Sequence, residues 1–594
     1  MSKKMAMVFV GVVIAGAGLF AQWSDDPAVN TVISDTTGTQ IMPKIVVKEN
    51  GESFVSWFSA MVGWRFDVYM QRLDADGNKL WAEEGLLISD NLTESWVSDY
   101  GLALDSDSCV VLVNHDFRTG FGDAFAWRIS PEGQFLWGND GIQLTNDTLA
   151  NYSPNLLPLE QGDIVFVWNI VPPDTLEEIQ VGLQRLSKEG QPQWGSDLII
   201  GDTMHNYQPS ILRTENDNFI LAWNRAESFD TMPGQENVLH IFAQKFDSSG
   251  TPMWTENVQI DTGEFLPVIS PIRPYLANDG NNGAFIVWEA EMDWTVTTRV
   301  QHIDADGNIQ YPPNGVEVST LDENTHVEPG FCFLPLTQEL FVFWSEYYYD
   351  DVLLKDNFGL YGQKFSYAGQ RLWGDSGKVF EPLVPDDTSF FDIVVKAGPE
   401  NDVAVFYVKS FSVVGPNQIK AIRIDTDGNY VWNDEKIVLS SVPSDKYNLA
   451  ASDFAHNQWI AVWADGRNSP PDNKEYGIYA QNINSDGSLG PAGIEEEKGE
   501  LASSSDLYPI SPNPSGSKVT IRYALPQATR VSLKVYDVNG RMVKTLEDAE
   551  QTGGVHSIHW NGSDDRGRAL SSGVYFARLE AGTEQRLAKI VLLR

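Results

Sequence analysis

The sequence predicts an all-β protein, an eight-bladed β-propeller followed by a small β-sandwich, and three observations lead to this fold. A unit first seen at residues 71–81, with a glycine-containing turn before a tryptophan, has seven further copies. The turn glycines are 56 to 62 residues apart, which is typical of repeats that bury their apolar faces against neighbouring units. Within each unit, apolar and polar residues alternate with a period of two, which indicates strands. The turn glycines are Gly77, Gly133, Gly190, Gly250, Gly307, Gly369, Gly428 and Gly487.

Each unit is expected to form four short antiparallel strands, which is the content of one propeller blade. In the first unit these strands are predicted at residues 44–47, 53–57, 66–74 and 79–88. Seven blades with one degenerate unit is the alternative. In the second unit, Asn114 stands at the end of the second strand. In the other seven units that strand ends on an aromatic residue: Trp57, Trp168, Trp223, Trp288, Trp344, Tyr407 and Trp463.

The two ends of the repeat region complement each other. Residues 22–33 look like the fourth strand of a blade, whereas the last unit has no tryptophan after Gly487. The N-terminal segment is therefore expected to close the ring as the outer strand of the eighth blade, where it would pair an otherwise open edge.

The chain divides into four segments. Residues 1–21 begin with Lys3 and Lys4, continue as an apolar run and end at Ala21, which predicts a cleavable signal peptide; an uncleaved anchor is the alternative. Residues 22–492 form the propeller, residues 493–507 are a polar linker, and residues 508–594 form the sandwich. We therefore expect a secreted or outer-membrane surface protein without a transmembrane span in the mature chain.

The net charge of the chain disfavours some classes of binding partner, and its two cysteines are not expected to form a disulfide. The chain carries 82 acidic and 41 basic residues, a net charge of −41, which disfavours nucleic acid and anionic membranes. Residues 518–594 carry 12 basic and 8 acidic residues (12 − 8 = +4), so the rest carries −45, and this asymmetry supports a separate domain. Cys109 and Cys332 lie in the second and sixth units, too far apart to pair, and we expect both to be small apolar side chains.

The C-terminal segment has several motifs of one module. They include the sequences of residues 508–514 (YPISPNP), 535–541 (VYDVNGR), 554–560 (GVHSIHW), 572–576 (SGVYF) and 589–594 (KIVLLR). These resemble the C-terminal sorting domain of type IX secretion cargo and, equally, the immunoglobulin-like module named after the flagellar hook-capping protein. The resemblance implies outer-membrane export, with the secretion machinery as a partner. The repeats themselves, with residues 463–467 (WADGR), resemble propeller-like units of secreted bacterial proteins.

Paired carboxylates precede three of the turn glycines. These candidates for calcium binding are Asp74 and Asp76, Asp304 and Asp306, and Asp425 and Asp427. The other five units have Ser, Asn or Ala at one or both of these positions, so the feature shared by all units is a short polar residue three before the glycine. A hairpin turn held by an Asx- or Ser-type hydrogen bond explains that pattern better than a metal, and we expect no cofactor.

The other polar residues show no arrangement that is typical of a catalytic site. The glutamines at one position of the third strand, Gln71, Gln184, Gln244, Gln301, Gln363 and Gln481, are expected to pair with backbone groups between blades. None of the eight histidines has a metal or catalytic-triad context. The innermost strands, exemplified by residues 44–47 and 392–395, are poor in charge, whereas a propeller hydrolase would aim several carboxylates or arginines into the channel.

The loops between the second and third strands differ most in length and carry aromatic residues beside carboxylates. Such residues suit sugar stacking or protein contacts. The predicted ligand-binding residues are Trp64, Phe117, Phe229, Trp294, Tyr347 and Tyr348. From these features we expect a protein that binds a glycan or surface protein, or that builds a surface structure, and that is not an enzyme. The alternative is a secreted glycan-acting hydrolase with its active site on this loop face.

Overall fold

The computed structural model describes two compact units, residues 1–492 and 493–594, which are treated separately. Almost every described element is a strand, which confirms the all-β prediction. No helix in the described part of the chain is long and apolar enough to cross a membrane. The described residues are 23–491, except 61–64, 94–98, 147, 173–177, 227–238, 263–265, 268–272, 293–294, 322, 351–353, 385–387, 412–415 and 470–474, together with 506–507 and 519–592, except 526–528, 539, 552–553, 567 and 583.

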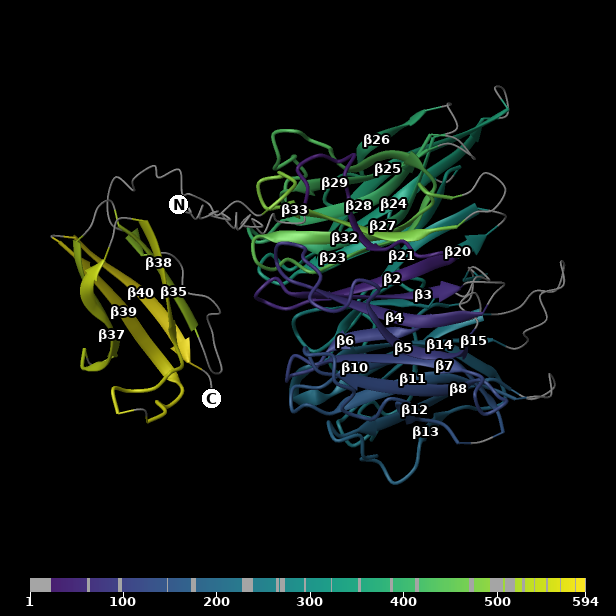
Figure 1. Ribbon diagram of the computed structural model, residues 1–594, viewed down its shortest axis with the longest axis horizontal. Coiled ribbons are helices and arrows are strands. Elements are labelled where there is room, and N and C mark those ends of the chain that lie inside the picture. Colours follow the sequence, from purple (N-terminus) through teal and green to yellow (C-terminus); the bar gives the residue numbers. More distant parts are fainter. Residues whose placement is uncertain are drawn as a thin grey trace, which may run out of the picture. The chain divides into compact units, whose positions relative to one another are not determined.

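The first unit contains eight antiparallel sheets among its described residues, one for each repeat, so the propeller has eight blades rather than seven (Figure 1). Blade 5 has five strands and the other blades have four. The strands are, in blade 1, β2 (Thr39–Val47), β3 (Ser53–Ala60), β4 (Phe66–Leu73) and β5 (Leu86–Thr93); in blade 2, β6 (Gly101–Leu104), β7 (Val110–Asp116), β8 (Asp123–Ile129) and β9 (Ile142–Gln143); in blade 3, β10 (Ala150–Pro158), β11 (Ile164–Val171), β12 (Gln180–Leu186) and β13 (Leu198–Ile200); and in blade 4, β14 (His205–Arg213), β15 (Phe219–Ala226), β16 (Leu239–Phe246) and β17 (Val258–Gln259), with a 3-10 turn at Glu215–Asp217. In blade 5 they are β18 (Leu266–Pro267), β19 (Tyr275–Asn278), β20 (Ala284–Met292), β21 (Thr295–Ile303) and β22 (Val316–Glu317); in blade 6, β23 (Thr325–Leu334), β24 (Glu339–Asp350), β25 (Lys355–Ser366) and β26 (Lys378–Val384); in blade 7, β27 (Ser389–Ala397), β28 (Val403–Ser410), β29 (Asn417–Ile424) and β30 (Ile437–Ser444); and in blade 8, β31 (Lys446–Ala451), β32 (Gln458–Asp465), β33 (Gly477–Asn484) and the N-terminal β1 (Thr31–Ser34).

The outer strands begin later than the sequence pattern predicted. Lys79 forms only one isolated bridge to Leu73, and the outer strand of blade 1 starts at Leu86. In between, the chain leaves the sheet so that Trp81 can reach the neighbouring blade, where its indole N–H donates to the Pro131 carbonyl over 3.0 Å. The alternation of side chains continued through this excursion and hid the break.

The glycine turns and the aromatic residues that follow them hold successive blades together, and we call this set the latch ring. In each contact, an aromatic side chain packs beneath the turn glycine of the next blade, as Trp254 does below Gly307. The backbone of Gly307 has φ +87°, and an added Cβ would lie 2.9 Å from the Trp254 ring, so no other residue fits there. Six of these residues donate an indole hydrogen bond to the next turn: Trp23 to Ala75, Trp81 to Pro131, Trp137 to Lys188, Trp194 to Ser248, Trp254 to Ala305 and Trp432 to Ser485.

The N-terminal segment closes the ring. Strand β1 pairs antiparallel with β33, so it is the outer strand of blade 8, as the sequence predicted. Trp23 takes the place of the missing tryptophan, because its ring lies against Gly77 and the Gln481 amide donates to the Ser24 carbonyl over 2.8 Å. In Figure 1 the purple β2 accordingly lies beside the green β32.

The repeated glutamines hold the hairpin between the third and fourth strands of their own blade. Gln71 is representative: its amide donates to the Ala82 carbonyl over 2.7 Å, and its oxygen accepts from the N–H groups of Arg72 and Trp81. The expectation that they satisfy backbone groups is correct, but most of their contacts lie within one blade rather than between blades.

The second unit is a sandwich of two sheets. One sheet has the order β34 (Asp506–Leu507), β35 (Val519–Leu525) and β38 (Gly554–Trp560). The other has the order β37 (Met542–Gln551), β36 (Thr529–Asp537), β39 (Gly573–Ala581) and β40 (Glu584–Leu592). Their inner faces enclose a core that includes Trp560, Tyr523 and Leu533, which gives this small unit a hydrophobic core of its own.

Candidate functional site

In six of the eight blades the innermost strand is interrupted by a β-bulge in its first half, whereas in blades 2 and 5 the described residues of this strand pair without a bulge. In blade 1, Ile41 pairs with Phe58 and Lys44 with Ser56, so two residues of β2 are left over. The first bulge residue has a positive φ in six blades, between 51° and 59°, which is strained for a residue other than glycine. The bulges lie near the ends that carry the loops between second and third strands, because Thr39 pairs with Ala60, the last residue of β3.

The first bulge residues form a set that we call the channel ring, because innermost strands surround the central channel of a propeller. Each stands 15 residues before the aromatic position of the second strand, or 16 in blade 6. Asp99 and Arg273 hold this place in blades 2 and 5, each at the edge of a segment outside the described residues. In blade order the ring is Met42, Asp99, Ser153, Gln208, Arg273, Glu328, Asp392 and Asn448.

Hydrogen bonds between neighbouring blades fix the bulges. The Asn448 side chain accepts from the Met42 N–H over 3.4 Å, and Asp392 accepts from the Leu449 N–H over 3.1 Å. In blade 6 the Glu328 N–H donates over 2.7 Å to Glu289, which lies on the second strand of blade 5. Side chains at these positions are therefore held by two blades at once, as a preorganised site requires.

Blades 5 to 7 contribute three carboxylates with raised pKa values. The pKa of Glu289 is raised to about 7, chiefly by burial. The hydrogen bond from the Glu328 N–H lowers this pKa, and the negative charge of Glu328 raises it further. Burial and then the charge of Asp392 raise the pKa of Glu328, and burial raises the pKa of Asp392. Glu289 is only 7% exposed, whereas Glu328 is exposed, so the buried member holds a proton near neutral pH beside a solvent-accessible partner.

The opposite arc of the channel is basic. Lys44 pairs with Asp99 at 2.8 Å, while the Asp99 side chain keeps 42% of its exposure, as expected for a residue that lines an open channel. Burial would raise the pKa of Asp99, but the positive charges of Lys44 and Arg273 lower it overall. Arg273 of blade 5 reaches across to blade 3, where it donates to the Ser153 carbonyl over 2.7 Å.

Aromatic residues precede the channel ring in four blades: Tyr152, Tyr207, Phe391 and Tyr447. Phe391 and Tyr447 stack with ring centroids 5.9 Å apart, and Tyr476 meets Tyr447 edge-on at the same distance. Tyr447 is 39% exposed. Flat aromatic faces beside carboxylates are the side chains that contact sugar rings.

The six residues predicted to bind a ligand are not all described. Trp64, Phe229 and Trp294 lie outside the described residues. Phe117 is half-buried and its ring lies 6.3 Å from that of Tyr152, so it borders the aromatic group just named. The Tyr347 hydroxyl donates to Asp356 over 2.8 Å, and Tyr348 is half-buried in β24.

The paired carboxylates of the turns serve the turn itself. An Asp74 oxygen accepts from the N–H groups of Asp76 and Asn78 over 3.0 and 2.8 Å, and the Asn78 amide also donates to this carboxylate. Asp304 and Asp425 accept the same pair of N–H bonds. No group of three potential metal-ligating side chains occurs in the described ranges.

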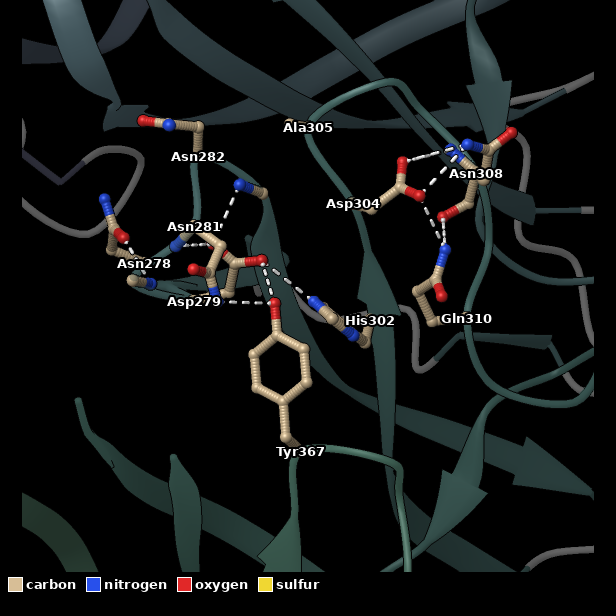
Figure 2. Close-up of polar contacts among 12 residues, drawn as sticks. Asn278, Asp279, Asn281, Asn282, His302, Asp304, Ala305, Asn308, Gln310 and Tyr367 are labelled. Atoms are coloured by element: carbon tan, nitrogen blue, oxygen red, sulfur yellow. Dashed lines mark hydrogen bonds and ion pairs between the residues drawn. The ribbon is translucent and has the colours of Figure 1, made fainter. Parts of the chain in front are cut away.

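One histidine does have the acidic and hydroxyl partners that the sequence did not reveal. His302 Nε2 lies 3.0 Å from Asp279, whose same oxygen accepts from the Tyr367 hydroxyl over 2.8 Å (Figure 2). Tyr367 belongs to the turn of blade 6 and the other two residues to blade 5, so this buried cluster joins two blades at the turn face. The partners of Asp279 are 23 and 88 positions away along the chain, which is why spacing could not predict the cluster.

The channel ring had a sequence signal that sequence reasoning missed. Five of its eight members are followed by proline, at Pro43, Pro154, Pro209, Pro274 and Pro329. A residue before proline is pushed away from helical angles, and a proline cannot donate to a sheet, so proline within a strand marks a bulge or an edge. A residue–proline pair at a fixed distance from the second-strand aromatic residue therefore indicates the ring.

The fold and the site define a β-propeller with a charged channel, joined to a C-terminal immunoglobulin-like domain. The FlgD Ig-like domain family matches residues 510–585. No curated protein matches this chain.

The similar solved structures match this chain at low identity and low TM-score. A polysaccharide lyase, Uly1, is 10% identical over 77% of this chain and 91% of its own, with a TM-score of 0.38. The α-L-arabinofuranosidase Arb93A from Fusarium graminearum is 10% identical over 53% of this chain and 92% of its own, with a TM-score of 0.32. A GH32 β-fructofuranosidase from Bombyx mori is 11% identical over 77% and 91%, with a TM-score of 0.28.

The expectation that this protein is not an enzyme is corrected. It rested on innermost strands poor in charge, but in six blades that description began after the first bulge position, so it omitted Asp99, Arg273 and Glu328. The channel carries the carboxylates and the arginine that the expectation denied, so the chemistry of the channel carries the correction. Glycosidases are among the solved structures named above, but at TM-scores below 0.5 they say nothing of the chemistry of this chain.

Proposed function

We propose that this protein is a glycan-acting hydrolase. Its active site is the group of carboxylates formed by Glu289, Glu328 and Asp392, which we call the acidic arc of the channel. The observation that carries the proposal is Glu289, a carboxyl held near its protonated form at neutral pH beside Glu328 and Asp392. Two carboxyls whose environments set them to different protonation states are the acid and base of glycoside hydrolysis.

The residues have separate roles in this reaction. Protonated Glu289 donates its proton to the glycosidic oxygen as the bond between that oxygen and the anomeric carbon breaks. Ionised Glu328, the exposed partner, takes a proton from the water whose oxygen forms the new bond to the anomeric carbon. Phe391 and Tyr447 support the adjoining sugar by stacking. The three carboxylates and the loops that differ most in length lie toward the same face.

Hydrolysis of a panel of neutral and acidic plant and algal polysaccharides, measured by release of reducing ends, tests the proposal. Glu289→Gln and Glu328→Gln are each expected to lower kcat at least 100-fold without changing the fold. The control is Glu160→Gln, because Glu160 lies at the other end of the innermost strands and is 72% exposed. Activity that survives both substitutions would refute the assignment of these carboxylates.

We further propose that the chain is exported to the cell surface or beyond it. The basic and apolar residues 1–21 support a signal peptide, and the motifs of residues 508–594 support a sorting role that engages the type IX secretion machinery. A reporter fused between these two segments, in a host with that secretion system, should reach the surface. Retention of the reporter in the periplasm would leave the C-terminal domain with a structural role only.

A further inference from the structure

Arg273 is half-buried in the channel, and its guanidinium has no ion pair among the described residues. Its guanidinium donates hydrogen bonds to the Ser153 and Pro209 carbonyls, over 2.7 and 3.5 Å. Carbonyl oxygens satisfy hydrogen bonds but do not neutralise a positive charge, and enclosed charges are normally paired. Burial lowers the pKa of Arg273, and the negative charge of Asp99 opposes this change.

Asp99 is not available to neutralise Arg273, because it is engaged by Lys44. The Lys44 ammonium lies 2.8 Å from the Asp99 carboxylate and 4.9 Å from the centre of the Tyr100 ring. Two cations and one carboxylate give this part of the channel a net charge of +1, whereas Glu289, Glu328 and Asp392 of blades 5 to 7 are all acidic. The channel therefore has a basic part and an acidic part.

We infer that Arg273, with Lys44, forms a subsite for the anionic group of an acidic sugar. This inference rests on the proposed function and specifies its substrate as a glycan whose residues carry a carboxylate or a sulfate. A guanidinium presents paired donors that match both oxyanions, whereas neutral sugars would leave its charge unmet.

The subsite lies close to the acidic arc. Tyr275 is the first residue of β19 and follows Arg273 by two positions. Burial and then the charges of Glu289, Glu328 and Asp99 raise the pKa of Tyr275, so it stands between the two arcs. Tyr275 is 36% exposed, and its ring lies 6.0 Å from that of Phe331. An acidic sugar held by Arg273 would thus place a neighbouring glycosidic bond toward Glu289 and Glu328.

Thermal shift with single sugars tests the subsite apart from catalysis. At constant ionic strength, glucuronate and glucose 6-sulfate should raise the Tm of the full chain, whereas glucose should not. The relative sizes of the two shifts distinguish a carboxylate from a sulfate as the preferred group. An equal response to glucose and to both acidic sugars would overturn the inference.

Binding of oligogalacturonate and of its neutral methyl ester gives the quantitative test. The acidic form should bind about tenfold more tightly, and Arg273→Gln should remove that preference. Arg273→Lys keeps the charge without the paired donors, so it should retain part of the preference and guards against loss of folding. Asp99→Asn should strengthen acidic binding, because it frees Lys44.

Two control variants separate this inference from the function on which it rests. Arg213→Gln removes a cation from an innermost strand at the other end, where it lines a cavity of about 650 Å³, and should leave the preference unchanged. Glu289→Gln should abolish hydrolysis but keep the preference for acidic sugars. If Arg213→Gln lowers the preference as much as Arg273→Gln does, the effect is one of overall charge and the subsite is refuted.

Discussion

The latch ring and the channel ring both occur once in every blade, but they conserve different properties. In the latch ring the residue types repeat: a glycine in each turn, and a tryptophan or tyrosine beneath it. In the channel ring the backbone geometry repeats, with φ between 51° and 59° in six blades, while the side chains range from methionine to arginine and glutamate. Identical side chains at equivalent positions perform one structural task eight times. Different side chains on one geometry leave each blade free to contribute its own chemistry.

Backbone strain also differs between the latch ring and the channel ring. The positive φ of the latch ring falls on glycine, which adopts it without cost, whereas that of the channel ring falls on residues that resist it. The channel ring therefore costs about 1 to 3 kcal/mol per strained residue, which the packing of the blades offsets. The comparison makes two kinds of prediction: changes in the latch ring should lower stability strongly, whereas changes in the channel ring should alter stability less and act mainly on binding and catalysis.

The largest effect is expected from deleting residues 22–35. This change removes Trp23 and β1, so it opens the edge of β33 and leaves the turn at Gly77 without its aromatic partner. Loss of one buried tryptophan alone costs about 3 to 5 kcal/mol, and the open edge adds to that cost. Urea unfolding should show a free energy of unfolding lower by at least that amount. Unchanged stability would mean that the ring is closed by other contacts.

Gly307→Val should come next, with a loss of about 3 kcal/mol in the free energy of unfolding. The substitution combines a strained φ with overlap between the new side chain and the Trp254 ring. Gly138→Val is the matched control, since Gly138 has φ +85° but no atom within 4 Å of an added Cβ. A similar loss in both variants would show that only the backbone angle matters and that the latch contact contributes little.

The pH dependence of stability should identify Glu289. Its pKa rises from 4.5 in the unfolded chain to about 7 in the folded protein, so the folded state holds more protons between these values. Stability from this group is complete below pH 4.5 and declines as the pH rises through 7, by about 3 kcal/mol at most. Glu289→Gln imitates the protonated form and should be more stable than the wild type at pH 8. Urea unfolding from pH 4 to 8 measures the difference, and an unchanged slope in the variant would assign the raised pKa elsewhere.

The smallest effect is expected at Gln208, a channel-ring residue with φ +53°. Gln208→Gly should relieve the backbone strain and keep the N–H bond to Asn169, so stability should rise by up to about 1 kcal/mol. Gln208→Val should instead lower it by about 1 to 2 kcal/mol, because a branched side chain resists this backbone angle. Equal stability of the two variants would contradict a strained bulge.

The sequence by itself determined the repeat and predicted the closure of the ring, and it favoured eight blades while leaving seven as the alternative. Each of these depends on local chemistry that recurs: the turn glycine, the tryptophan after it, and the alternation that defines strands. Even the absence of a tryptophan after Gly487 was informative, because the N-terminal Trp23 supplies it. The outer strands were misplaced by several residues, since alternation alone cannot distinguish pairing within a sheet from a chain that crosses to the next blade.

Only the tertiary structure decided the candidate site. The members of the channel ring are about 55 to 65 residues apart along the chain, and their partners come from other blades, as when Glu289 of blade 5 accepts from the backbone of blade 6. The pKa of Glu289 arises from burial and from the charge of Glu328, neither of which is a property of the local sequence. The proline after Glu328 predicts that its strand bulges. That the bulges meet around one channel, and so gather carboxylates on one side and cations on the other, follows only from the closing of eight blades into a ring.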